Sequence, residues 1–246
     1  MPIFEKLHPQ AVFAQFEQLC AIPHGSGNTK AISDYLVRFA AARGLRHIQD
    51  AHNNVIIFCP GTPGYEAAAP VILQGHMDMV CETAPDCAKD MTSEGLDLFV
   101  DGDTIGARGT TLGGDDGIAV AMALAILDAD DIPHPPLEVV LTVDEETGML
   151  GADALDASVL QGRTMLNLDS EDEGILTVSC AGGNVSVCTL PVTRAAFSGT
   201  ALTVTVGGLL GGPSVPLRQP QAPRDPDRDA GAGKFLQPEL YPDRGA

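Results

Sequence analysis

Residues 71–78 read Val-Ile-Leu-Gln-Gly-His-Met-Asp and give the clearest indication of the fold class. Its first four residues form a short apolar run typical of a buried strand, and His76 and Asp78 follow directly after it. The same order returns at residues 137–146, where a continuous apolar run is followed by Glu145 and Glu146. In both places, polar side chains able to do chemistry come just after a buried strand.

The surrounding segments alternate between helix-like and strand-like patterns. Apolar residues recur with helical spacing in residues 32–42, with Gly44 placed to end the helix, and residues 117–129 form a strongly apolar helix. Further short strands are expected at residues 54–58, 165–168 and 175–178. This alternation predicts an α/β domain with a mixed, mostly parallel sheet flanked by helices.

Ligands of such sheets bind beyond the carboxyl ends of the strands. Asp169 follows the expected strand at 165–168, and Asp115 and Asp116 lie in a glycine-rich loop just before the helix that begins at Gly117. We therefore expect these acidic groups to meet His76 and the Glu145–Glu146 pair at one edge of the sheet.

Composition narrows the classes of partner. The chain has 246 residues and a formal net charge of −19, which argues against nucleic acid and against an anionic membrane surface as partners. The start of the chain shows no apolar leader, and the longest apolar stretch, residues 118–127, is too short to cross a bilayer. The six cysteines are scattered and form no Cys-x-x-Cys pair, so we expect reduced thiols and a cytoplasmic protein.

The clustered residue types match a site for divalent metal ions. His76, Asp115, Glu146 and Asp169 would supply one imidazole and three carboxylates, which are ligands for zinc, cobalt or manganese. A carboxylate shared by two ions would hold them about 3.5–4 Å apart. Glu145 would then accept a proton from the attacking water, and Asp78 would fix the orientation of His76.

Each of these residues also has an ordinary structural explanation. A histidine after a strand is commonly a loop residue, and paired glutamates are commonly solvated. Two aspartates before a helix are favoured by the helix dipole. His24, in the turn Pro23-His-Gly-Ser-Gly27, is interpreted as structural. The metal hypothesis depends on several strand-end positions converging.

Four ordered motifs resemble one family. They are Gln-Gly-His-Met-Asp-Met-Val at 74–80, Ala-Arg-Gly-Thr-Thr-Leu-Gly-Gly-Asp-Asp-Gly at 107–117, Thr-Val-Asp-Glu-Glu-Thr-Gly at 142–148 and Asn-Leu-Asp-Ser-Glu-Asp-Glu-Gly at 167–174. Together with Ile-Pro-His-Gly-Ser-Gly at 22–27 and Cys-Ala-Gly-Gly at 180–183, they are similar to the co-catalytic zinc dipeptidases called aminoacyl-histidine dipeptidase or cytosol non-specific dipeptidase. The resemblance covers about residues 1–212.

The resemblance implies a division of roles. His76 and Asp169 would bind one zinc ion, Glu146 the other, and Asp115 would bridge the two. Glu145 would be the general base for hydrolysis of unblocked dipeptides, Xaa-His among them. The family also implies a homodimer and a zinc-peptidase-like catalytic domain interrupted by an inserted α+β lid domain. On this basis, residues 1–183 would be the first part of the catalytic domain and residues 184–212 the start of the lid, with its first strands at 185–187 and 202–206.

The resemblance fails near Gly212. Where the family has Gly-Gly-His-Ser-Gly in the lid, this chain reads Gly-Gly-Pro-Ser-Val at 211–215, and no later segment matches the part that supplies the last histidine ligand. Residues 213–246 contain seven prolines and little periodicity, so we expect a disordered tail, with a frameshift or misassigned gene end near Gly212 as the hypothesis. Peptidase activity would then be weak or absent.

Two other functions remain open from the sequence. A related amidohydrolase, such as a deacetylase or aminoacylase, could use the same metal core. Alternatively, the chain could be an inactive fragment that binds metal without turnover. Cleavage of free dipeptides compared with N-acylated amino acids, and the number of ions bound per chain, would separate these alternatives.

Overall fold

The structure is a computed structural model that describes residues 2–170, 174–179, 189–191 and 193. Contacts within the chain group the residues up to 175 into one compact unit, which holds every helix and strand of the described chain. The expected lid strands at 185–187 and 202–206 and the expected tail at 213–246 lie outside the described residues. In order, the elements are α1 (Gln10–Cys20), α2 (Lys30–Ala42), β1 (Arg46–Gln49), β2 (Val55–Cys59), β3 (Val71–His76), β4 (Leu98–Asp101), β5 (Thr104–Ala107), α3 (Gly114–Leu127), β6 (Leu137–Thr142), α4 (Leu150–Ala154), a 3₁₀ turn (Ala157–Val159) and β7 (Thr164–Asn167).

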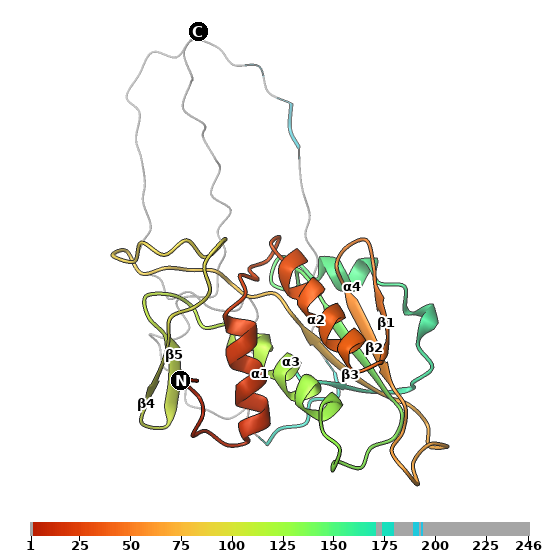
Figure 1. Cartoon of the computed structure of the whole chain (residues 1–246). Coiled ribbons are helices and arrows are strands. Elements are labelled where there is room, and N and C mark those ends of the chain that lie inside the picture. The colour runs from red at the N-terminus through yellow and green to blue at the C-terminus, as the bar shows by residue number, and fades with distance from the viewer. Residues whose placement is uncertain (1, 171–173, 180–188, 192, 194–246) are drawn as a thin grey trace, which may run out of the picture. The chain divides into compact units, whose positions relative to one another are not determined.

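The main sheet has five strands in the order β1-β2-β6-β3-β7 (Figure 1). The pairs β6–β3 and β3–β7 are parallel, whereas β1–β2 and β2–β6 are antiparallel. The predicted α/β class with a mixed sheet is therefore confirmed, and parallel pairing is found among the strands that carry the candidate site. Strands β4 and β5 form a separate antiparallel hairpin.

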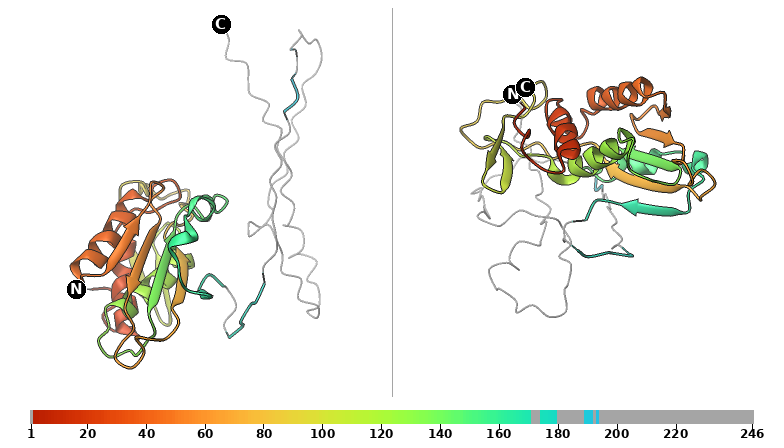
Figure 2. Two further views of the ribbon diagram at one scale, coloured as in Figure 1. Left: turned by 90° about the vertical axis from the view of Figure 1, so that its right-hand side faces the viewer. Right: turned by 60° about the horizontal axis from the view of Figure 1, so that its bottom comes forward.

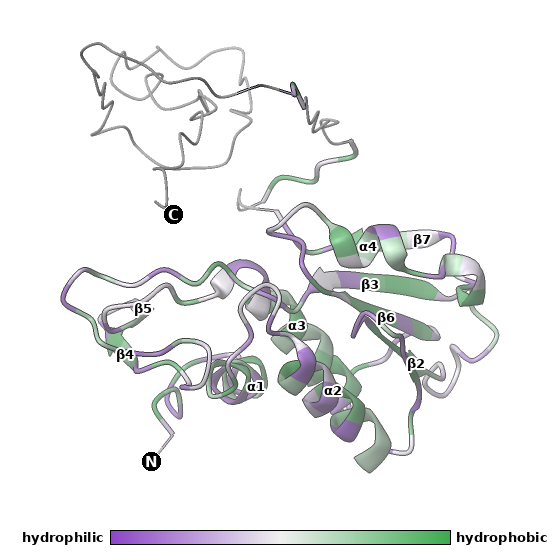
Figure 3. Cartoon of the chain, turned by 90° about the horizontal axis from the view of Figure 1, so that it is seen from above, coloured by the Kyte–Doolittle hydropathy of each residue, from purple (hydrophilic) through white to green (hydrophobic). Residues whose placement is uncertain are grey.

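Helices α1, α2 and α3 lie on one face of the sheet, and α4 lies on the other (Figures 1 and 2). Successive residues of a strand face opposite sides of the sheet, so each strand contributes side chains to the apolar clusters on both faces. Val55 and Ile57 of β2 join the helix-side core, whereas Ile56 packs with Ile72 and Val140 under the segment that contains α4 and the 3₁₀ turn. The central strands β3 and β6 are accordingly largely apolar (Figure 3).

Most predicted elements are present with shifted ends. Strand β3 extends to His76, so that residue ends the strand where the sequence placed it beyond the end. Helix α2 matches the predicted helix, and Gly44 follows it in the left-handed region (φ 66°). The expected strand at 175–178 is wrong, because these residues have no regular secondary structure and no strand of the described chain pairs with them. None of the helices in the described part is long and apolar enough to span a membrane.

Candidate metal centre

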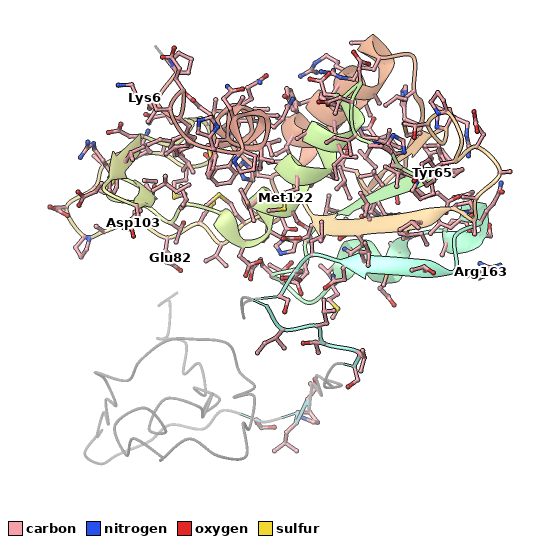
Figure 4. All side chains as sticks on the ribbon, turned by 90° about the horizontal axis from the view of Figure 1, so that it is seen from below. Lys6, Tyr65, Glu82, Asp103, Met122 and Arg163 are labelled. Carbon is pink, nitrogen blue, oxygen red and sulfur yellow. The ribbon has the colours of Figure 1, made fainter. Side chains whose placement is uncertain are left out.

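Parallel pairing brings three loops to one edge of the sheet. His76 at the end of β3 is level with Thr142 of β6, and Gln74 is level with Asn167 of β7. Glu145 and Asp169 follow these two strands by only a few residues. In Figure 4, β7 starts beside the labelled Arg163 and runs away from it, so the end of β7 that leads to Asp169 lies at the opposite end of the strand from Arg163.

His76 is almost completely buried, with 1% of its surface exposed, and each ring nitrogen faces a different partner. Nδ1 lies 3.0 Å from the carbonyl oxygen of Asp78 and 3.4 Å from its Oδ1. Nε2 lies 3.1 Å from Oδ1 of Asp115. Nδ1 can donate its proton to Asp78, and Nε2 would turn its lone pair toward an ion beside Asp115 once that ion displaced the second proton.

Asp78 is buried and holds the imidazole of His76 in place through Nδ1. Its Oδ2 accepts a hydrogen bond from Oγ of Ser26 (2.8 Å), and its Oδ1 accepts one from the backbone N–H of Glu145 (3.1 Å). Burial alone would raise the pKa of Asp78, but the hydrogen bonds from His76, Ser26 and Glu145 favour the charged form, and the pKa is lowered. Asp78 is thus held as a carboxylate.

Two aspartates at the start of α3 point to different environments. Gly113 precedes the helix in the left-handed region (φ 70°), the Asp115–Asp116 peptide is cis, and neither aspartate has helical backbone angles. The Asp115 side chain is 60% exposed, whereas Asp116 is 2% exposed and accepts a hydrogen bond from the backbone N–H of His76 (3.2 Å) at Oδ2. Gly75 permits this approach, since a Cβ there would lie 2.5 Å from that oxygen.

The turn after β6 places the two glutamates. Asp144 has a left-handed backbone (φ 54°), and its Oδ1 accepts a hydrogen bond from the N–H of Gly27 (2.6 Å). The carbonyl of Glu145 accepts hydrogen bonds from the N–H groups of Gly148 and Met149, both at 2.9 Å. Glu145 is half-buried beside Asp78, and Glu146 is exposed.

Two overlapping groups of side chains could each hold a cation. His76, Asp115 and Glu146 form one, and Asp115, Asp116 and Asp169 form the other, with ligand atoms within 4.8 Å of one another in each. Asp115 belongs to both groups. His76 is grouped with Glu146, and Asp169 is grouped with Asp115 and Asp116. The bridging role of Asp115 and the division of ligands between two ions stay predictions.

The geometry and charge of the cluster fit a divalent ion. Two ligands bound at about 2.0–2.1 Å in a tetrahedral site lie about 3.3 Å apart, close to the 3.1 Å between His76 Nε2 and Asp115 Oδ1. Burial alone would lower the pKa of His76, but Asp78, Asp116 and Asp169 together raise it to about 10. Burial raises the pKa of Asp116 to about 7, and burial with neighbouring carboxylates raises those of Glu145 and Glu146. The carboxylates that raise the pKa of His76 would also favour a bound cation, and burial of Asp116 and Glu145 adds to the benefit of neutralising them.

The sequence alone does not indicate the roles of three residues here, Ser26, Asp116 and Asp144. Ser26 is 52 residues from Asp78, and Asp144 is 117 residues from Gly27. The glycines at 25 and 27 mark a turn, but they do not indicate which segments it contacts.

The fold and this cluster are those of an α/β protein with a candidate site for divalent metal ions. The chain belongs to peptidase family M20/M25/M40, whose family model matches residues 72–212. It is 39% identical to the cytosol non-specific dipeptidase of Escherichia coli strain K12 over 87% of this chain and 44% of that protein.

Solved structures agree with this assignment. The aminoacylhistidine dipeptidase of Vibrio alginolyticus matches with a TM-score of 0.68 and 42% identity, over 70% of this chain and 35% of that one. A tripeptidase of Staphylococcus aureus matches with a TM-score of 0.57 and 26% identity, over 68% of this chain and 44% of that one. The chain thus spans less than half the length of each of these relatives.

Proposed function

We propose that this chain takes part in metal-dependent hydrolysis of unblocked dipeptides, Xaa-His among them, with zinc as the resident metal. The observation that carries the proposal is the convergence of His76, Asp115 and Glu146 beside Glu145. The names of the relatives, a cytosol non-specific dipeptidase and an aminoacylhistidine dipeptidase, support the substrate class. The cytoplasm is the proposed compartment, in keeping with the free thiols of the four described cysteines.

Each side chain has a proposed role. His76, Asp115, Glu146 and Asp169 would hold the ions, and Asp78 would keep the imidazole of His76 oriented for binding. When bound, divalent ions would acidify water and polarise the peptide carbonyl. Glu145 accepts the proton of the attacking water and delivers it to the leaving amine. Burial and the surrounding carboxylates raise the pKa of Glu145. A pKa closer to neutral suits a group that must first accept a proton and then give it up.

The test is to load the full chain with zinc and measure amino acids released from free dipeptides and from N-acylated amino acids. Cleavage of free dipeptides that is lost in Glu145→Gln, while zinc remains bound, supports the proposal. Preferential cleavage of N-acylated substrates overturns it in favour of an amidohydrolase. Zinc binding without turnover of either substrate leaves a metal-binding chain that is not a peptidase.

A further inference from the structure

The turn at residues 24–27 is built into the edge of the sheet that carries the candidate metal centre. Gly25 pairs with Met79 as an isolated parallel bridge, with hydrogen bonds from Met79 N–H to the carbonyl of His24 and from Ser26 N–H to the carbonyl of Met79, both 3.2 Å. The N–H of Gly27 donates to Asp144. The turn is therefore tied both to the segment after β3 and to the turn after β6.

The backbone on either side of Ser26 requires glycine for two different physical reasons. A Cβ on Gly25 would lie 2.5 Å from Sγ of Cys81, so a side chain there would push the turn away from the site. Gly27 has a φ of 78°, a conformation that L side chains rarely adopt. The sequence Gly-Ser-Gly thus allows a close approach in which Ser26 alone presents a side chain.

That side chain reaches the buried oxygen of Asp78. Oγ of Ser26 donates to Oδ2 at 2.8 Å, whereas Oδ1 accepts from the Glu145 amide and faces Nδ1 of His76. The Asp78 side chain has no exposed surface, and Ser26 is the donor to Oδ2 among the described residues. Without it, a buried carboxylate oxygen would lack a partner and the carboxylate could rotate away from both neighbours.

We propose that Ser26 is a positioning residue for the metal centre, acting through Asp78 to fix the imidazole of His76 and the backbone of Glu145 at once. This inference rests on the proposed metal-binding function. In the proposed arrangement His76 would bind the metal and Asp78 would orient His76. Ser26, 50 residues before His76, adds one further hydrogen bond by donating to Asp78. Partners of this outer kind affect metal affinity by orienting the ligand, although they never touch the ion.

The experiment measures zinc affinity of the full chain by competition with a chromophoric chelator, after the protein has been stripped of metal. Ser26→Ala should weaken zinc binding about 10–100-fold, and it should alter the visible absorption spectrum of the cobalt-loaded protein. Ser26→Thr, which keeps the hydroxyl, should retain most of the affinity. Ser26→Val, which has the shape of threonine without the hydroxyl, should lose it, so this pair decides the question even if Ser26→Ala does not fold.

Ser33→Ala is the matched control. Ser33 lies on α2 and is fully buried, whereas Ser26 is half-buried. The hydroxyl of Ser33 donates to the carbonyl of Asn53 at 2.7 Å and not to a residue of the cluster. This variant should lower the urea midpoint of unfolding without changing zinc affinity or the cobalt spectrum, which is what a purely structural serine would do.

The outcomes separate this inference from the proposed function. If wild-type protein binds zinc and His76→Ala does not, the metal centre stands, and equal affinity in the Ser26→Thr and Ser26→Val variants overturns the role of Ser26 alone. If wild-type protein binds no zinc, or His76→Ala binds it as well as wild type, both the metal centre and the role of Ser26 are overturned.

Discussion

The two sides of the candidate metal centre differ in how firmly the chain holds them. On one side, His76, Asp78 and Asp116 are almost fully buried and linked by hydrogen bonds to one another and to the backbone. On the other, the Asp115 side chain is 60% exposed, and Glu146 is exposed as well. The buried side is pre-organised, whereas the exposed side offers ligands that water can reach.

The largest effect is expected from His76→Ala. It removes the imidazole from the described cluster, and we expect zinc affinity to fall by more than the roughly 10–100-fold typical of outer partners. Glu146→Gln, on the exposed side, should weaken binding less. Chelator competition measures both, and a greater loss in Glu146→Gln would reverse the ranking of the two sides.

Gly75→Ala tests the packing of the buried side. The added Cβ would lie 2.5 Å from Asp116 Oδ2 and 3.2 Å from the Cβ of Ala119, so something must shift. We expect a loss of about 1–3 kcal/mol in the free energy of unfolding, measured by urea denaturation of the metal-free protein.

Gly114→Ala is the control for that substitution. Gly114 has open space around its Cβ position, and its φ is not positive. Unfolding should therefore change little, and an equal loss in both variants would show that the close contact at Gly75 is not the cause.

Stabilisation by zinc should grow as pH rises. The folded pKa of His76 is raised from 6.5 to about 10 and that of Asp116 from 3.8 to about 7. Both groups thus add stability at low pH that the metal-free protein loses as pH rises through these values. Zinc replaces the proton on His76, so the increase in Tm on adding zinc should be larger at pH 8 than at pH 6.

Thermal unfolding of the wild type and His76→Ala at each pH checks this linkage. In His76→Ala the increase in Tm caused by zinc should be small at every pH. A zinc effect that shrinks as pH rises would contradict the assignment of the buried imidazole as a ligand.

The smallest effect is expected from Glu146→Gln in the absence of metal. The substitution removes one exposed charge near Asp115 and Glu145. The pKa of Glu146 is raised mainly by burial and further by the like charges of Asp115 and Glu145. Stability should stay within about 0.5 kcal/mol of the wild type. Urea denaturation measures it, and a large loss would mean that the exposed side supports the fold.

The sequence predicted those features that follow from local patterns. Apolar periodicity located α2, β3 and β6, and the rule for strand ends grouped His76 with the acidic residues that the structure brings near it. Helix α1 and the β4–β5 hairpin were not predicted. The contacts of Ser26 and Asp116 could not be, because they join segments whose approach depends on the packed fold.

Among the strands that the structure describes, β7 pairs only with β3, and all four of its residues are exposed. An edge strand of this kind opens locally more readily than the centre of a sheet. Its amide protons should exchange with deuterium sooner than those of β3. Since Asp169 lies two residues after the end of β7, an ion bound by Asp169 would restrain this edge strand, and slower exchange along β7 would then report metal binding.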